Sequence, residues 1–400
     1  MTIALLTPPG RGAIATLAVT GADAGALVAR LFEPASGGSF AAAPPGRVAY
    51  GRWLSTGEDV IACRVAHDRV EIHCHGGRVA PGEILRSLVA LGAREQSWQS
   101  WVEVREADPI GVAAQVALAG AGAGRAALVL ADQYHGALRR EIAAILDSLE
   151  HADAPAAGRA LETLCRRAKL GARLTEPWTV LLAGRPNVGK SSLLNRILGY
   201  ERAIVCDEPG TTRDVLRGAT ALDGWPFEFW DAAGLRDAVD PLEAAGVART
   251  RERAAEVDLV ALVFAAGEPW TAEDDALCVA FPEAIRIVNK SDLATPRDVQ
   301  ERLARASSSA SASAGIGFAA PQPESSTDAI AASALTGAGF DVLCRTIVSR
   351  LIGEAPPNGA AVPFTAAQRT GLEQAARHVA AGELAAAGET LRDGEPWKLR

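Results

Sequence analysis

The fold of this chain is decided by the stretch Gly184-Arg185-Pro186-Asn187-Val188-Gly189-Lys190-Ser191. It follows the apolar run 180–183 and leads into 192–198, where apolar residues recur at helical spacing. A strand, a glycine-bounded loop and a helix in this order form a phosphate-binding loop, whose N–H groups and helix dipole attract an anion. We expect Lys190 to reach the β- and γ-phosphates of a nucleotide and Ser191 to hold Mg²⁺. The alternative is a tight turn with a surface lysine, and the motifs downstream decide between the two.

Two motifs that follow the phosphate-binding loop carry groups for Mg²⁺ and the γ-phosphate. Residues 210–214 (Gly-Thr-Thr-Arg-Asp) lie in a polar loop. There the Thr212 hydroxyl would bind Mg²⁺ and sense the γ-phosphate. Asp231 ends the expected strand 227–230, and its carboxylate would belong to the Mg²⁺ shell, while the amide of Gly234 would contact the γ-phosphate.

Two later motifs select the base. Asn289-Lys290-Ser291-Asp292 follows the apolar strand 285–288. Asp292 can accept both N–H groups on the guanine edge, a bidentate and charge-assisted contact that adenine does not offer. Ser333-Ala334-Leu335 ends the last expected strand and would support the base through a backbone amide. Five motifs in this order predict a guanine-nucleotide-binding domain, and Asp292 disfavours the alternative of an ATPase.

The residue after Gly234 bears on hydrolysis. In Ras-like switches a glutamine at this point orients the attacking water, whereas this chain has Leu235, which cannot do so. Another group must therefore position the water. Glu243 is the nearest plausible acid, and the alternative is an exposed glutamate in the first turn of a helix.

Composition limits the location and the partners of the chain. It has 400 residues, 48% of them hydrophobic, a net charge of −8 and six cysteines without paired spacing. The cysteine pattern favours a reducing cytoplasm, and we expect neither a signal peptide nor a membrane span. A negative charge gives no general attraction to nucleic acid. An RNA contact would need a local basic patch such as 166–173, which we interpret first as a solvated helix face.

The chain reads as an α/β protein of several domains. Residues 1–100 indicate a small α/β domain, and 101–174 an alanine-rich helical region. Residues 177–353 alternate strands and helices, as a parallel sheet with crossover helices requires. The Ser/Ala/Pro-rich stretch 306–327 indicates a surface insertion in this domain. A linker and a final amphipathic helix follow.

The triplet His73-Cys74-His75 suggests a metal site at first sight. On a strand, alternation places the two histidines on one face and Cys74 on the other. No second cluster of ligands lies nearby in the sequence. We therefore favour an ordinary strand here.

At this point the sequence resembles a family, the MnmE (TrmE) tRNA-modification GTPases. The resemblance covers most of the chain and is carried by five stretches: 7–12, 71–77, 184–192, 203–205 and 210–216. It implies an N-terminal folate-binding dimerisation domain (1–100), a G domain (177–353), and a helical domain split around it (101–174 and 355–400).

The resemblance also implies an activity and its partners. Family members hydrolyse GTP with Mg²⁺, and use K⁺ beside the phosphates where other systems use an arginine finger. Their G domains dimerise across the nucleotide. With the flavoprotein MnmG they modify C5 of the wobble uridine of certain tRNAs, and a tetrahydrofolate is a further cofactor.

By position, the resemblance assigns K⁺ to the Asn187 side chain and to the backbone carbonyls of Cys206, Glu208 and Thr211. Glu243 aligns with the water-positioning glutamate of the family and joins Lys190 and Gly234 as a catalytic group. The nucleotide contacts expected from motifs and resemblance together are Asn187, Val188, Gly189, Lys190, Ser191, Ser192, Cys206, Asp207, Glu208, Pro209, Gly210, Thr211, Thr212, Asp231, Ala232, Ala233, Gly234, Asn289, Lys290, Ser291, Asp292, Ser333, Ala334 and Leu335.

The chain departs from the family pattern at several points. Its C-terminus lacks the motif with a cysteine and a final lysine, Ala18 replaces an arginine, Ala232 replaces a threonine, and 93–113 is shortened. Of the expected folate contacts only Glu71 is present. The alternative hypothesis is therefore a degenerate relative that binds GTP as a switch or assembly module and modifies no RNA.

Overall fold

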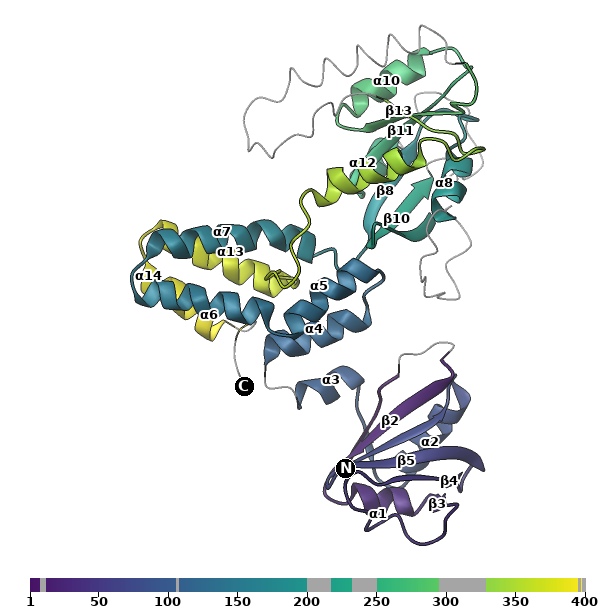
Figure 1. The fold of residues 1–400 in the computed structure, drawn as a ribbon, viewed down its shortest axis with the longest axis vertical. Helices are drawn as coiled ribbons and strands as arrows, with labels where there is room; N and C mark the ends of the chain where they lie inside the picture. The colour runs from purple at the N-terminus through teal and green to yellow at the C-terminus, as the bar shows by residue number, and fades with distance from the viewer. Residues whose placement is uncertain are drawn as a thin grey trace. The chain divides into compact units, whose positions relative to one another are not determined.

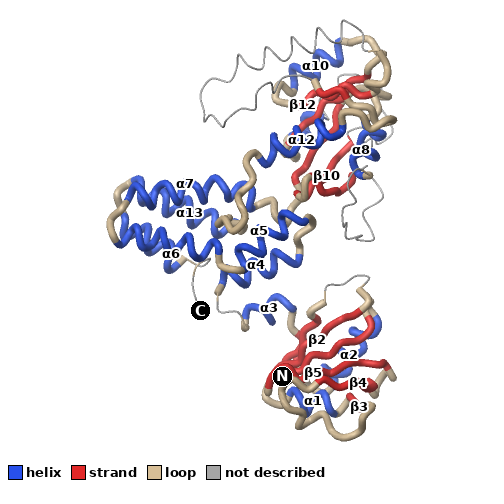
Figure 2. Tube along the Cα trace, viewed as in Figure 1, coloured by secondary structure: helices blue, strands red, loops and turns tan. Residues whose placement is uncertain are grey.

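The computed structural model describes residues 1–7, 12–105, 108–199, 217–231, 250–294, 329–394 and 397. They form two compact units, one from Met1 to Val112 and one from Ala113 onward. Figures 1 and 2 show the helices and strands of each unit. None of the described helices is long and apolar enough to cross a membrane.

The first unit is built on a sheet in the order β3-β4-β5-β6-β2-β1-β7. All neighbours are antiparallel except β1 and β7. Alternate residues of β6 (Val70, Ile72, Cys74) are buried, as expected where one face of a sheet covers a core. The strands are β1 (Thr2–Leu5), β2 (Ile14–Thr20), β3 (Phe32–Pro34), β4 (Val48–Trp53), β5 (Glu58–Ala66), β6 (Arg69–His75) and β7 (Arg94–Glu95), and the helices are α1 (Ala24–Ala29), α2 (Val79–Ala90) and α3 (Trp98–Glu103).

The second unit contains the sheet β13-β12-β11-β8-β10-β9, parallel throughout except for the β9–β10 pair. Its central strand β8 is apolar and buried from Val180 to Ala183, because a parallel sheet covered on both faces excludes water from its inner strands. This is the parallel sheet that the sequence predicts. Its elements are β8 (Trp178–Ala183), α8 (Lys190–Leu198), β9 (Arg217–Leu222), β10 (Trp225–Asp231), β11 (Leu259–Ala265), α10 (Ala272–Ala280), β12 (Ile285–Asn289), β13 (Ile330–Ala331) and α12 (Phe340–Ile352).

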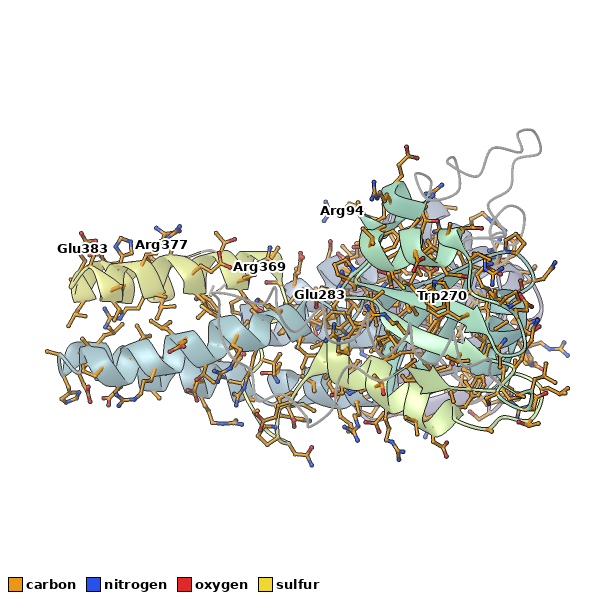
Figure 3. All side chains as sticks on the ribbon, turned by 90° about the horizontal axis from the view of Figure 1, so that it is seen from above. Arg94, Trp270, Glu283, Arg369, Arg377 and Glu383 are labelled. Atoms are coloured by element: carbon orange, nitrogen blue, oxygen red, sulfur yellow. The ribbon has the colours of Figure 1, made fainter. Side chains whose placement is uncertain are left out.

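Helices that precede the sheet in the sequence pack together with helices that follow it. They are α4 (Pro109–Ala119), α5 (Gly124–Tyr134), α6 (Ala137–Glu150), α7 (Ala154–Gly171), α13 (Ala366–Ala380) and α14 (Leu384–Asp393). Helix α13 packs on α7 and α14, and α14 packs on α6 (Figure 1). The charged residues Arg369, Arg377 and Glu383 remain exposed on this layer (Figure 3). The division of the whole chain into three domains stays a prediction.

Helix α5 connects the sheet to the segment that leads into α13. The Arg125 amide donates to the carbonyl of Gly224 in the β9–β10 turn at 2.8 Å. Nine residues after Gly124, the fully buried Gln133 donates to the Ala360 carbonyl at 3.0 Å and accepts from the Val362 amide at 3.1 Å. We call residues 357–364 the connecting segment. Two of its backbone groups thus depend on one buried glutamine.

Candidate nucleotide-binding site

The phosphate-binding loop turns sharply at its two glycines. Gly184 has φ +149° and Gly189 has φ +94°, the left-handed half of the map that favours glycine. A Cβ on Gly184 would lie 2.3 Å from the Val263 carbonyl oxygen, and one on Gly189 would lie 2.2 Å from Nδ2 of Asn289. Conformation and space therefore both require glycine, and the loop packs against Val263 within β11 and Asn289 at the end of β12.

Lys190 is held over this loop. Its side chain is buried, and Nζ donates to the carbonyl oxygens of Gly184 at 2.8 Å and Arg185 at 2.7 Å. The ammonium group is thus kept at the start of α8, where the dipole and the free N–H groups of the helix favour an anion. The contact of Lys190 with phosphate stays a prediction.

Ser191 and Asp231 meet at the edge of the loop. The Ser191 hydroxyl donates to Oδ2 of Asp231 at 2.5 Å. Asp231 is fully buried at the end of β10, in register with Leu182 of the neighbouring β8. A hydroxyl and a carboxylate in contact offer the hard oxygen donors that Mg²⁺ prefers. The residues present therefore fit the divalent ion expected beside a nucleotide.

The base-reading motif is tied to the phosphate-binding loop by Asn289. This buried side chain donates from Nδ2 to the Val188 carbonyl at 2.9 Å, and its Oδ1 accepts the Ala334 amide at 3.1 Å. The Ala334 amide, one candidate for contact with the base, is thus bonded to Asn289. Leu335, the last residue of the same motif, has an exposed side chain and lies in the turn after β13.

Asp292 is oriented by a neighbouring hydroxyl. Ser333, which is fully buried, donates from Oγ to Oδ1 of Asp292 at 2.5 Å and accepts the Thr336 amide at 3.2 Å. The Ser291 amide donates to the Ala332 carbonyl at 3.1 Å, which fixes the loop to the segment after β13. The carboxylate that is expected to read guanine is therefore positioned before any base arrives.

Sequence reasoning missed two acidic residues of the site. Glu268 accepts Nζ of Lys290 at 2.8 Å, and the almost fully buried Asp274 accepts Nε of Arg185 at 2.9 Å. Asp274 also forms a capping box with Thr271 at the start of α10. The spacing Thr-x-x-Asp could have indicated the cap, but no local pattern identifies the partners of these carboxylates across the fold.

Comparison with known proteins places this geometry in a family. Residues 179–290 match the family model described as 50S ribosome-binding GTPase. The chain is 33% identical to the tRNA modification GTPase MnmE of Roseiflexus castenholzii, over 94% of this chain and 87% of that protein. It is 34% identical to that of Chloroflexus aurantiacus (98% and 90% covered) and 32% identical to that of Moorella thermoacetica (94% and 88%). The chain belongs to the MnmE family. It is accordingly a GTP-hydrolysing enzyme.

Several residues expected to act in an MnmE-type site lie outside the described residues, and their roles stay predictions. They are Cys206, Asp207, Glu208, Pro209, Gly210, Thr211, Thr212, Ala232, Ala233, Gly234 and Glu243. Asn187 and Ser192 are described and exposed, and Asn187 has φ +66°. The Asn187 side chain therefore lies on the solvent-exposed side of the phosphate-binding loop.

Glu71, the remaining folate contact expected from the MnmE resemblance, lines neither of two pockets in its unit. Its carboxylate is 3.8 Å from Nε of Arg69 and 3.9 Å from Nε2 of His73. Ala18 is its partner across the β2–β6 pair. A pocket of about 270 Å³ is instead lined by residues of β1, β2 and α2 and the loops beside them, among them Thr7, Gly12, Ile14, Gly77, Arg78 and Pro81. The structure does not bring Glu71 into this pocket.

Side chains of the strand 73–75 and of the basic patch 166–173 contact other residues of the protein. Burial and the charge of Glu58 raise the pKa of the Cys74 thiol to about 11, and His75 contacts Glu58 at 2.6 Å. Groups of three or more metal-binding side chains are absent from the described part of the chain. In the basic patch, Arg167 donates to the Ala361 carbonyl at 3.2 Å and Arg173 pairs with Asp258.

Proposed function

We propose that this protein hydrolyses GTP with Mg²⁺ and K⁺ as part of the modification of C5 of the wobble uridine in tRNA. In this proposal it is a cytoplasmic homodimer that works with an MnmG-type flavoprotein. The observation that carries the GTPase part is the contact between Ser191 and Asp231. The RNA part rests on the similarity to proteins named tRNA modification GTPase MnmE over most of the chain.

The described residues support a division of labour around the triphosphate. Lys190 would bind the β- and γ-phosphates, and Ser191 with Asp231 would hold Mg²⁺, which neutralises charge that develops on the phosphates. Asn289 and Ser333 would keep the base-reading loop and Asp292 in place for guanine. The protein would thus bind both the triphosphate and the guanine base of the nucleotide.

The K⁺ ion and the attacking water involve residues outside those described. Asn187 and the carbonyls of Cys206, Glu208 and Thr211 would bind K⁺, whose charge would take the place of an arginine finger. Glu243 would position the water, because Leu235 cannot accept or donate a hydrogen bond through its side chain. The exposure of Asn187 in a loop that faces the phosphates supports its part of this assignment.

One complementation experiment tests both parts of the proposal. A strain that lacks this gene should lose the C5-modified wobble uridine, as measured by mass spectrometry of tRNA nucleosides, and the wild-type gene should restore it. The gene carrying Asn187→Ala should restore little, and the purified variant should lose the stimulation of GTP turnover by K⁺ over Na⁺. Equal turnover in K⁺ and Na⁺ by the wild-type protein would contradict the ion assignment.

The second candidate function is a GTP-binding switch that modifies no RNA. It is favoured by the position of Glu71, which pairs with Arg69 and His73 beside the buried Ala18 and does not line the pocket. The one folate contact that this chain retains is therefore not among the residues that line this pocket. Unchanged tRNA nucleosides in the deletion strain, together with normal GTP binding, would establish this candidate instead.

A further inference from the structure

Glu268 lies between the two loops that hold opposite ends of the nucleotide. Its Oε1 accepts Nζ of Lys290, from the base-reading loop, at 2.8 Å. Its Oε2 is 3.9 Å from a terminal guanidinium nitrogen of Arg185, from the phosphate-binding loop. Each carboxylate oxygen thus faces a cation of a different loop. All three side chains are between 18% and 33% exposed, so the contacts are partly shielded from water.

The Arg185 side of this bridge is held by several further contacts. Nε of Arg185 donates to Asp274, whose side chain is 1% exposed, and a terminal nitrogen donates to the Pro269 carbonyl at 3.1 Å. Asp274 is fixed in turn by the capping box with Thr271. The carbonyl of Arg185 accepts Nζ of Lys190. The turn that carries Glu268 and Pro269 is therefore joined to the loop that holds the phosphate-binding lysine.

The Lys290 side of the bridge needs such support. Lys290 has φ +60°, a left-handed conformation that is strained outside glycine and persists only where the surrounding contacts offset the strain. Its long side chain also loses rotamer freedom when it is ordered. A carboxylate that holds the ammonium group in the free protein reduces both costs at the moment of binding.

We propose that Glu268 is a positioning residue for guanine nucleotides, which acts through Lys290 and Arg185 to keep the base-reading and phosphate-binding loops at the separation that the nucleotide needs. It touches neither the base nor the reacting atoms. The proposal rests on GTP binding alone and is independent of the role in tRNA modification.

The test compares Glu268→Gln with Glu283→Gln. Glu283 is an exposed residue of the same sheet domain that contacts Arg350 at 3.6 Å (Figure 3). We expect Glu268→Gln to weaken GDP binding about fivefold, to speed GDP release, and to raise KM for GTP while kcat changes by less than about twofold. Glu283→Gln should match the wild type. Affinity within twofold of wild type in Glu268→Gln would overturn the proposal.

A double-mutant cycle separates positioning from general destabilisation. In a Lys290→Ala background, Glu268→Gln should change GDP affinity by less than about twofold, because its main partner is already absent. Glu268→Asp, which keeps the charge but shortens the reach, should give an intermediate affinity and serves if Glu268→Gln folds poorly. The role assigned to Glu268 is wrong if its substitution weakens GDP binding equally in both backgrounds. It is also wrong if the substitution lowers the free energy of unfolding of the nucleotide-free protein by as much as it lowers the free energy of GDP binding.

Discussion

Single polar contacts decide whether the site is ready for a nucleotide. Ser333 illustrates this, since one hydroxyl orients the carboxylate of Asp292 and also accepts the Thr336 amide. The sequence predicts Asp292 from its motif, but it assigns Ser333 a backbone role only. A side-chain contact between residues 41 positions apart depends on how β12 and β13 pair, which no local pattern contains.

Replacement of Ser333 by alanine tests this contact. Asp292 would lose a charge-assisted hydrogen bond, so part of the binding energy of guanine would be needed to orient it. We expect Ser333→Ala to weaken GTP binding about tenfold, as measured by calorimetry, since hydrogen bonds to charged groups contribute about 1.5–3 kcal/mol. Ser349→Ala, on the exposed side of α12, is the control. Equal affinities of the two variants would show that Asp292 is oriented without Ser333.

At the scale of elements, helix α7 shows how the room around a glycine decides whether a larger residue can replace it. Its last residue, Gly171, lies against the connecting segment, so a Cβ there would be 1.7 Å from the carbonyl oxygen of Pro363. Earlier in the same helix, a Cβ on Gly158 would meet Val379 at an ordinary 3.8 Å. The heptad-like stripe of Leu161, Leu164 and Ala168 predicts the buried face of α7. It does not predict that a crossing chain covers the end of the helix.

These two glycines should respond oppositely to alanine. Gly171→Ala must displace backbone, and we expect a loss of about 1–3 kcal/mol in the free energy of unfolding. Gly158→Ala meets no clash in a helix interior, where alanine is favoured over glycine by about 0.5–1 kcal/mol, so a gain of that size is expected. Urea unfolding measures both. A destabilised Gly158→Ala or an unaffected Gly171→Ala would mean that α7 packs differently.

At the scale of the whole molecule, much of the sheet architecture follows from the sequence because its motifs sit at strand ends. The strand before the phosphate-binding loop and the strand before Asn289 are both found as predicted, at β8 and β12. The contacts between α5 and the connecting segment were not predictable. Gln133 is assigned no role from the sequence, whereas the residue is fully buried and bonded to residues more than 220 positions away.

Loss of Gln133 should therefore affect more than one element. In Gln133→Ala the buried amide of Val362 and the carbonyl of Ala360 lose this partner, and we expect a loss of about 2 kcal/mol in unfolding free energy. Gln374→Ala, on the exposed side of α13, is the matched control and should change the urea midpoint little. A midpoint of Gln133→Ala equal to that of the control would show that the connecting segment is held by other contacts.

The packing of α13 on α7 has a consequence for the order in which the protein can fold during its synthesis. The apolar stripe of α7 is complete once residue 171 has been made, but its cover begins at Ala366. At typical rates of translation, about 5–20 residues per second, some 10–40 s separate the two. During that interval α7 can pack on α6, which has already been made, but the face that α13 will cover has no partner while the sheet domain between them is still emerging. A chaperone that binds nascent chains would find its target there.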